Sequence, residues 1–229
     1  MRHLLSLTIF IVSFLSCKTK TESIVAENSI QLLIPDTTKN IRAQLDLDYV
    51  GRCSQIAKQL GLENLEKGVD SFEIRLWNDH SFSSSNELFI LKLLDTTYSM
   101  TYYRLYYREY DYENRNRQWN PFRQPIVDSC FSKTVLLKKA DLKNLNLQEV
   151  WSLHSQSELK IPDSVGFNDC YTNTIEVADK NRYKFMSHHC PNGYFEKLKL
   201  KDITNFTDYF QKIEILANEN NAIIPYKYN

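Results

Sequence analysis

Two short segments of alternating apolar and polar residues, 172–177 and 183–188, constrain the fold more than any other part of the chain. Alternation with a period of two predicts strands that each have one buried face. The residues between them, Asp179, Lys180 and Asn181, suit a three-residue hairpin loop. The sequence therefore predicts an antiparallel hairpin in the second half of the chain.

The register of this hairpin brings two cysteines together. A three-residue loop sets Val177 opposite Tyr183, and the same register sets Cys170 opposite Cys190. Directly opposed Cα atoms of antiparallel strands lie about 4.5–5.5 Å apart, which is within the range that a disulfide needs. We therefore predict a Cys170–Cys190 disulfide, with two free buried thiols as the alternative.

Cys53 and Cys130 also lie beyond the amino-terminal segment. Four cysteines are an even number, as in many proteins of oxidising compartments. A Cys53–Cys130 disulfide follows by elimination only. A buried, free Cys53 on a helix face is the alternative.

The first 17 residues have the order of a secretory signal. Arg2 precedes an apolar run of about a dozen residues, which is short of the roughly 20 needed to cross a bilayer. The run ends in Phe14-Leu15-Ser16-Cys17, which resembles the lipobox of bacterial lipoproteins, although Phe14 departs from the more common leucine. The resemblance implies cleavage before Cys17 and acylation of its thiol. A secretory peptide with a cysteine near the cut by chance is the alternative.

This resemblance implies that the chain has three segments and that the protein is attached to a membrane. Residues 1–16 are expected to be the signal peptide, 17–30 the lipidated cysteine with a polar tether, and 31–229 one globular domain. The membrane is then a partner through acyl chains such as palmitate, because several buried chains make anchoring nearly permanent. The second mature residue is not the Asp that resembles an inner-membrane retention signal. We therefore expect an outer-membrane anchor that faces the periplasm.

The charge balance excludes one class of partner. The chain has 28 basic and 28 acidic side chains, so it lacks the positive surface typical of nucleic-acid binding. The 14 tyrosines and 12 phenylalanines favour extended strands with aromatic packing.

The order of the expected elements indicates an α+β fold. Helices are expected at 47–60, with Asp46 as cap, at 147–154, and at 206–216, with Asn205 as cap. Strands are expected at 72–77, 88–94, 98–110 and 130–137, besides the hairpin. We predict a mostly antiparallel sheet built from hairpins, with about three helices packed on one face.

One predicted strand carries tyrosines and arginines on a single face. This stripe could be exposed and bind an envelope protein or a glycan, or it could pack under a helix with its arginines paired. The second interpretation is favoured because tyrosines are common on sheets. The loop that follows, 111–123, adds aromatic and basic residues that could bind. The candidate partner-binding residues are Tyr98, Tyr102, Arg104, Tyr106, Arg108, Tyr110, Trp119 and Arg123.

No common catalytic motif occurs in the sequence, and we assign no catalytic residue, metal or cofactor. The hairpin brings Asp169 and the two cysteines close to His188 and His189, and such residues can bind zinc. However, adjacent histidines on a strand point to opposite faces, and the disulfide competes for both thiols.

Two functions follow as hypotheses. The first is a non-catalytic binding module, for example an inhibitor or immunity-type lipoprotein. The alternative is an envelope hydrolase or a metal-dependent enzyme with a site near His188 and His189.

Overall fold

The computed structural model describes residues 29–36, 38, 43–80, 85–94, 96–108, 125–162, 164–167 and 170–225. This part of the chain forms a seven-stranded sheet in the order β1-β7-β6-β2-β3-β4-β5. Only β1 is parallel to its neighbour, so the prediction of a mostly antiparallel sheet is confirmed. The strands are β1 (Gln31–Leu33), β2 (Phe72–Asp79), β3 (Ser85–Leu94), β4 (Thr97–Tyr107), β5 (Val127–Leu137), β6 (Thr172–Ala178) and β7 (Arg182–His189).

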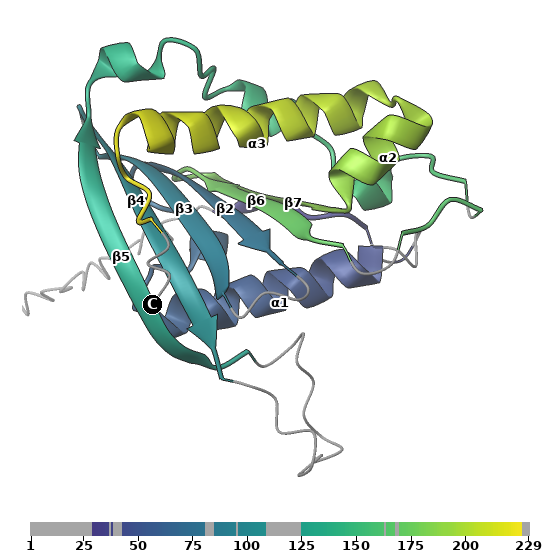
Figure 1. The fold of residues 1–229 in the computed structure, drawn as a ribbon, viewed down its shortest axis with the longest axis horizontal. Coiled ribbons are helices and arrows are strands. Elements are labelled where there is room, and N and C mark those ends of the chain that lie inside the picture. Colours follow the sequence, from purple (N-terminus) through teal and green to yellow (C-terminus); the bar gives the residue numbers. More distant parts are fainter. Residues whose placement is uncertain are drawn as a thin grey trace, which may run out of the picture.

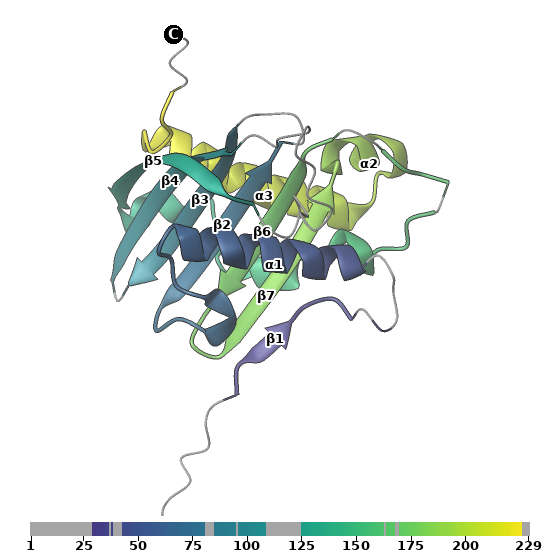
Figure 2. The same ribbon diagram turned by 90° about the horizontal axis from the view of Figure 1, so that it is seen from below.

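Helices cover both faces of this sheet (Figures 1 and 2). Helix α1 (Ala43–Gln59) lies on one face, and α2 (Pro191–Leu198) and α3 (Lys201–Glu219) lie on the other. The α+β class is confirmed, but the expectation that the helices pack on one face is wrong. The central strands are apolar on both sides: Leu76 faces the α3 core, and Trp77 faces the α1 core. Each face therefore needs its own cover.

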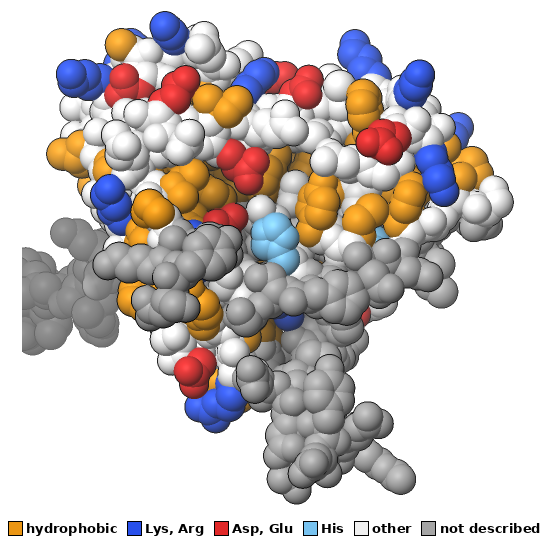
Figure 3. All heavy atoms as spheres, in the orientation of Figure 1, with side chains coloured by type: hydrophobic (Ala, Val, Ile, Leu, Met, Phe, Trp, Pro, Cys, Tyr) orange, Lys and Arg blue, Asp and Glu red, His pale blue; other side chains and the backbone are white. Residues whose placement is uncertain are grey.

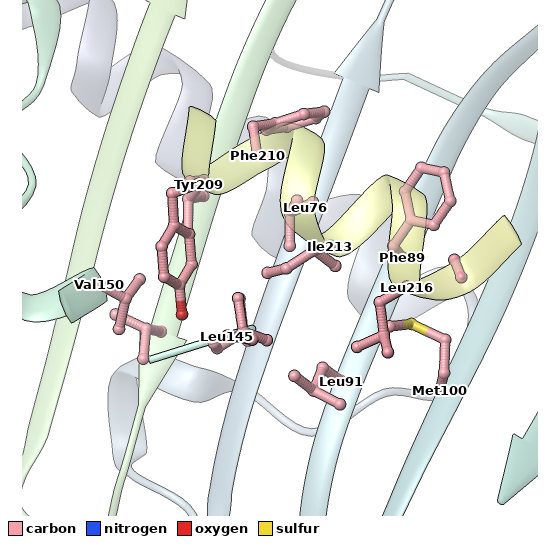
Figure 4. Packing of buried hydrophobic residues seen from close by; sticks show 14 of the residues in the cluster. Leu76, Phe89, Leu91, Met100, Leu145, Val150, Tyr209, Phe210, Ile213 and Leu216 are labelled. Carbon is pink, nitrogen blue, oxygen red and sulfur yellow. The ribbon is translucent and has the colours of Figure 1, made fainter. Parts of the chain in front are cut away.

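The larger core lies between α3 and the sheet (Figure 4). Apolar residues recur along α3 at intervals of three and four, which places them on one side of the helix. They pack onto alternate residues of β2, β3 and β4 that share one face. Labelled examples are Tyr209, Phe210, Ile213 and Leu216 of the helix and Leu76, Phe89, Leu91 and Met100 of the sheet.

The first and last predicted helices exist, but both begin earlier than expected. Helix α1 begins at Ala43, so Asp46 is a buried residue of its first turn rather than its cap. Asp46 accepts hydrogen bonds from the hydroxyls of Ser155, at 3.1 Å, and Ser157. Burial raises its pKa to about 6, against the opposing effect of these bonds. Helix α3 begins at Lys201, so Asn205 does not cap it either.

The predicted helix 147–154 is wrong, because this segment forms only a short 3₁₀ turn. Its Val150 side chain is buried as the apolar spacing indicated, but the chain is extended again at Leu153. The 3₁₀ helices of the described residues are η1 (Leu65–Lys67), η2 (Lys139–Leu142), η3 (Glu149–Ser152) and η4 (Gln156–Glu158).

The hairpin forms with a register that differs by one residue from the prediction. Ala178 faces Tyr183, and Val177 faces Lys184. Asp179 is the reason: its Oδ1 accepts the backbone N–H groups of Asn181 and Arg182, both at 2.9 Å. Its own N–H donates to the carbonyl of Arg182. These bonds close a turn with two residues between Asp179 and Arg182.

The Cys170–Cys190 disulfide is confirmed, with a Cα–Cα distance of 5.2 Å. Tyr171, rather than Cys170, pairs with Cys190 through the backbone. The disulfide is thus a diagonal link just beyond the paired strands. The Cys53–Cys130 pairing is wrong: Cys53 is free and buried against the sheet, whereas Cys130 is free and exposed on the edge strand β5.

The expected signal peptide, Cys17 and most of the tether lie outside the described residues. Within the described part of the chain, no helix combines the length and the apolar character needed to cross a membrane.

Candidate functional site

One end of the sheet face below α3 is polar, and we call its five residues the polar row. His188 of β7 pairs with Asn173 of β6, and Asn173 pairs with Asn78 of β2. Asn78 pairs with Glu87 of β3, and Glu87 pairs with Arg104 of β4. Directly opposed residues point to the same face, so these side chains form a continuous line across five strands.

The polar row interrupts an otherwise apolar surface. Two residues away on the same faces of their strands lie Leu76, Phe89 and Ile175, all buried in the α3 core. The row is itself well covered: the exposed fraction is 0% for His188 and 6% for Asn173. Burying polar groups is costly unless each is hydrogen-bonded, so the partners of these side chains decide what the row does.

The Glu87 half of the row is a connected network. The Tyr102 hydroxyl donates to Glu87 Oε1 at 2.7 Å, and Arg104 Nη2 donates to the Tyr102 oxygen at 2.9 Å. Arg104 also lies 3.8 Å from Glu87, as an ion pair. Burial and the adjacent Glu87 raise the pKa of Tyr102, so this tyrosine is neutral and bridges the two charges.

The other half of the row, from His188 to Asn78, contains three acceptor atoms without hydrogen-bond partners. The His188 ring stacks on Phe206 with centroids 4.0 Å apart, and its Nε2 donates to the carbonyl of His154 at 2.9 Å. Burial lowers the pKa of His188 to about 4, so the ring is neutral and Nδ1 is an acceptor. Among the described residues, nothing bonds to His188 Nδ1, Asn173 Oδ1 or Asn78 Oδ1, and all three atoms are buried.

Glu214 of α3 is coupled to the row through the charge of Glu87. Burial, and then the charge of Glu87, raise the pKa of Glu214 to about 7. Glu214 in turn contributes to the raised pKa of Tyr171, after burial. We call the region between the polar row and α3 the recess. Figure 3 shows a hollow below α3 in which acidic and histidine side chains lie among hydrophobic ones.

Replacing Glu214 with glutamine is expected to remove a pH-dependent loss of stability. The folded protein holds the Glu214 proton more tightly than the unfolded chain does. Stability therefore falls as the pH rises from the ordinary value of 4.5 to about 7. Relative to wild type, Glu214→Gln should gain about 3 kcal/mol between pH 4.5 and pH 8. Urea unfolding at both pH values measures this, with Glu219→Gln, an exposed residue of the same helix, as the control.

The opposite face at this end of the sheet has a small cavity. A cavity of about 10 Å³ lies beside Arg52, Asp79 and Tyr107, which is room for about one water molecule. Arg52 and Asp79 form an ion pair at 2.9 Å there.

The packed interpretation of the tyrosine and arginine stripe holds for Tyr102 and Arg104. Tyr102 and Arg104 are buried, with exposed fractions of 0% and 4%. Tyr98 and Tyr106 are half-buried, and Arg108 is exposed beyond the end of β4. The other candidates, Tyr110, Trp119 and Arg123, lie outside the described residues.

The two histidines of β7 point to opposite faces, as expected. His188 lies in the polar row, and His189 Nδ1 lies 3.1 Å from Thr172 Oγ1. The described residues include no cluster of three or more His, Cys, Asp or Glu side chains suited to a metal ion.

Four residues of the site escaped sequence reasoning: Asn78, Glu87, Asn173 and Glu214. The first three occupy strand positions whose parity is that of the buried apolar residues. Asn78 continues the series Ile74 and Leu76. A polar residue at a strand position that faces the core was the sequence signal that could have identified them.

No protein-family model matches the chain, and no curated protein sequence does.

Proposed function

We propose that this protein is a lipid-anchored binding module of the cell envelope that holds a small ligand, or one group of a larger partner, in the recess. The observation that supports the binding site is the set of three buried acceptors without partners: His188 Nδ1, Asn173 Oδ1 and Asn78 Oδ1. The lipobox-like end of the first 17 residues supports the anchor.

The cost of these acceptors argues for a ligand. An unsatisfied buried polar group costs about 1–3 kcal/mol, and apolar residues of similar shape would avoid that cost. Sites that break the rules of core packing are often functional, with stability sacrificed for activity. A ligand with hydrogen-bond donors would supply the missing partners.

The position of the recess limits what can bind. The polar row lies on the sheet face that α3 covers, and His188, Asn173 and Arg104 are buried there. A covered site of this kind suits a small molecule, a single side chain or a terminal sugar rather than a flat protein surface. An inhibitor or immunity-type module that captures one protruding group of its partner is consistent with it.

The proposed binding site is tested by comparing how leucine substitutions at two buried asparagines change the stability of the protein. Asn173→Leu should raise the free energy of unfolding by about 1 kcal/mol, because it removes an unpaired acceptor. Asn86→Leu should lower it by about 1–3 kcal/mol, because Asn86 accepts from the His80 N–H and donates to Asp79. Urea unfolding measures both. A loss in Asn173→Leu as large as in Asn86→Leu would show that the row is structural and would overturn the proposed site.

Cys17→Ala tests the anchor. We expect the variant to lose incorporated palmitate and to leave the membrane fraction, because the acyl chains are the only proposed attachment. Labelling of cells with radioactive palmitate, followed by fractionation, measures this. Cys130→Ala is the matched control and should keep the label, because Cys130 lies in the folded domain.

A further inference from the structure

Strand β5 leaves one edge of the sheet open (Figure 1). It is the last strand in the sheet order and pairs on one side only, with β4. The residues from Asp128 to Thr134 are all exposed, so neither face of the strand is covered there. Among the described residues, no strand lies beyond it. The other edge of the sheet offers far less to a partner, because β1 has only three residues.

The sequence of β5 lacks the features that normally keep an edge strand from pairing. Such strands are usually short or are interrupted by prolines and several charged residues. β5 has 11 residues and no proline, and its charged residues are Asp128 and Lys133. A bulge disturbs the pairing with β4 at the start of β5, and from Ser129 onward the register is regular. This regular stretch can therefore accept a further strand.

The register with β4 decides which backbone groups of β5 are open. Leu94 and Thr97 close a two-residue hairpin between β3 and β4, so they form a hydrogen-bonded pair. Bonded and non-bonded residues alternate along an antiparallel strand, so odd-numbered residues of β4 bond to β3 and even-numbered ones bond to β5. In the regular part of β5, the residues that pair with these even-numbered residues are odd-numbered. The N–H and C=O groups that point away from β4 are therefore those of Cys130, Ser132 and Thr134.

The exposed part of β5 is complementary to itself in an antiparallel arrangement. Asp128 and Lys133 lie on either side of Phe131 and have opposite charges. A two-fold axis at Phe131 sets this ring opposite its own copy. It also sets Lys133 opposite Ser129 of the second copy, beside Asp128 of that copy. A parallel arrangement in register would instead bring like charges together.

We infer that two copies of this chain pair through their β5 strands, antiparallel about Phe131, and form one continuous sheet through both domains. The symmetric contact uses the same edge of both copies, so assembly stops at a dimer whose outer edges are the short β1 strands. The contact covers Phe131, which is 58% exposed in the single chain. It contains no residue of the polar row and is independent of the proposed binding function.

Cysteine cross-linking tests the contact and its register. The full-length protein is extracted in detergent and carries Cys130→Ala, which removes the exposed native thiol. Copper phenanthroline should link Phe131→Cys into a dimer on a non-reducing gel, because opposed non-bonded residues lie about 4.5 Å apart at Cα. The matched control is Leu136→Cys, which replaces a residue that is 75% exposed on the same strand. It should stay monomeric, because its two copies lie roughly 30 Å apart in this register.

A second pair of variants tests the backbone bonds. The Ser132 N–H points away from β4, so Ser132→Pro removes a bond of the dimer and none of the ladder to β4. Sedimentation equilibrium in density-matched detergent should show a dimer for the wild type and a monomer for Ser132→Pro. Ser132→Ala, which keeps the N–H, should remain a dimer. Circular dichroism confirms that each variant is folded.

Several outcomes would overturn the inference. They are a monomeric wild type, equal cross-linking of Phe131→Cys and Leu136→Cys, no cross-linking of Phe131→Cys, and a dimer that persists in Ser132→Pro. None of them affects the proposed function, which depends on the stability comparison of Asn173→Leu and Asn86→Leu.

Discussion

Replacing Phe206 with alanine is expected to lower the free energy of unfolding by about 3–5 kcal/mol. Phe206 is 0% exposed, and its ring lies between His188, at 4.0 Å, and Phe210, at 6.3 Å. Truncation removes these contacts and opens a cavity between α3 and the sheet. For a domain of this size the midpoint of thermal unfolding should fall by roughly 10 °C. Calorimetry and urea unfolding measure both quantities.

The control for this prediction lies on the same helix. Ile215 is 55% exposed, so Ile215→Ala should change stability by no more than about 0.5 kcal/mol. A loss below about 1 kcal/mol for Phe206→Ala would contradict the packing of α3 described above. Because Phe206 covers His188, the same variant should also lower the affinity for any ligand that binds in the recess.

Removing the Cys170–Cys190 disulfide is expected to cost about 3 kcal/mol. The bond closes a loop with a sequence separation of 20 residues, which limits the freedom of the unfolded chain. It also links Cys170 to Cys190, whose backbone N–H donates to the carbonyl of Tyr171. Urea unfolding of the double variant Cys170→Ala and Cys190→Ala measures the loss.

Reduction provides an independent check on the disulfide. Wild type in dithiothreitol should unfold at the same urea concentration as the double variant in either condition. Cys130→Ala, which changes a free and exposed cysteine, should behave like wild type. A double variant as stable as oxidised wild type would contradict the prediction.

The local spacing of apolar residues was sufficient to predict the regular helices and the hairpin. The period of two found the hairpin, and the helical period found α1 and α3. The register failed because Asp179 closes a shorter loop with its side chain, and the position of a residue in the sequence does not show which backbone groups it will cap. The segment around Val150 failed because its apolar spacing also fits an irregular chain that packs against a core.

The site could be predicted only in part. His188 was a candidate because of its place beside the disulfide, and Tyr102 and Arg104 because of their alternation. Their shared location depends on the strand order, which places β6 beside β2 although these two strands are far apart in the chain. Single-sequence periodicity gives the face of a residue but not its neighbours on other strands.

The short strand β1 determines how the domain responds to a pull from its amino-terminal side. It is the outermost strand of the sheet, and only three residues pair it with β7 (Figure 2). Tension transmitted from a fixed amino terminus reaches this strand first, and so short a ladder opens at low free energy. Detachment of β1 leaves the five strands of the polar row paired. If the protein is anchored as proposed, a mechanical load on its amino-terminal side is thus relieved without spreading to the polar row.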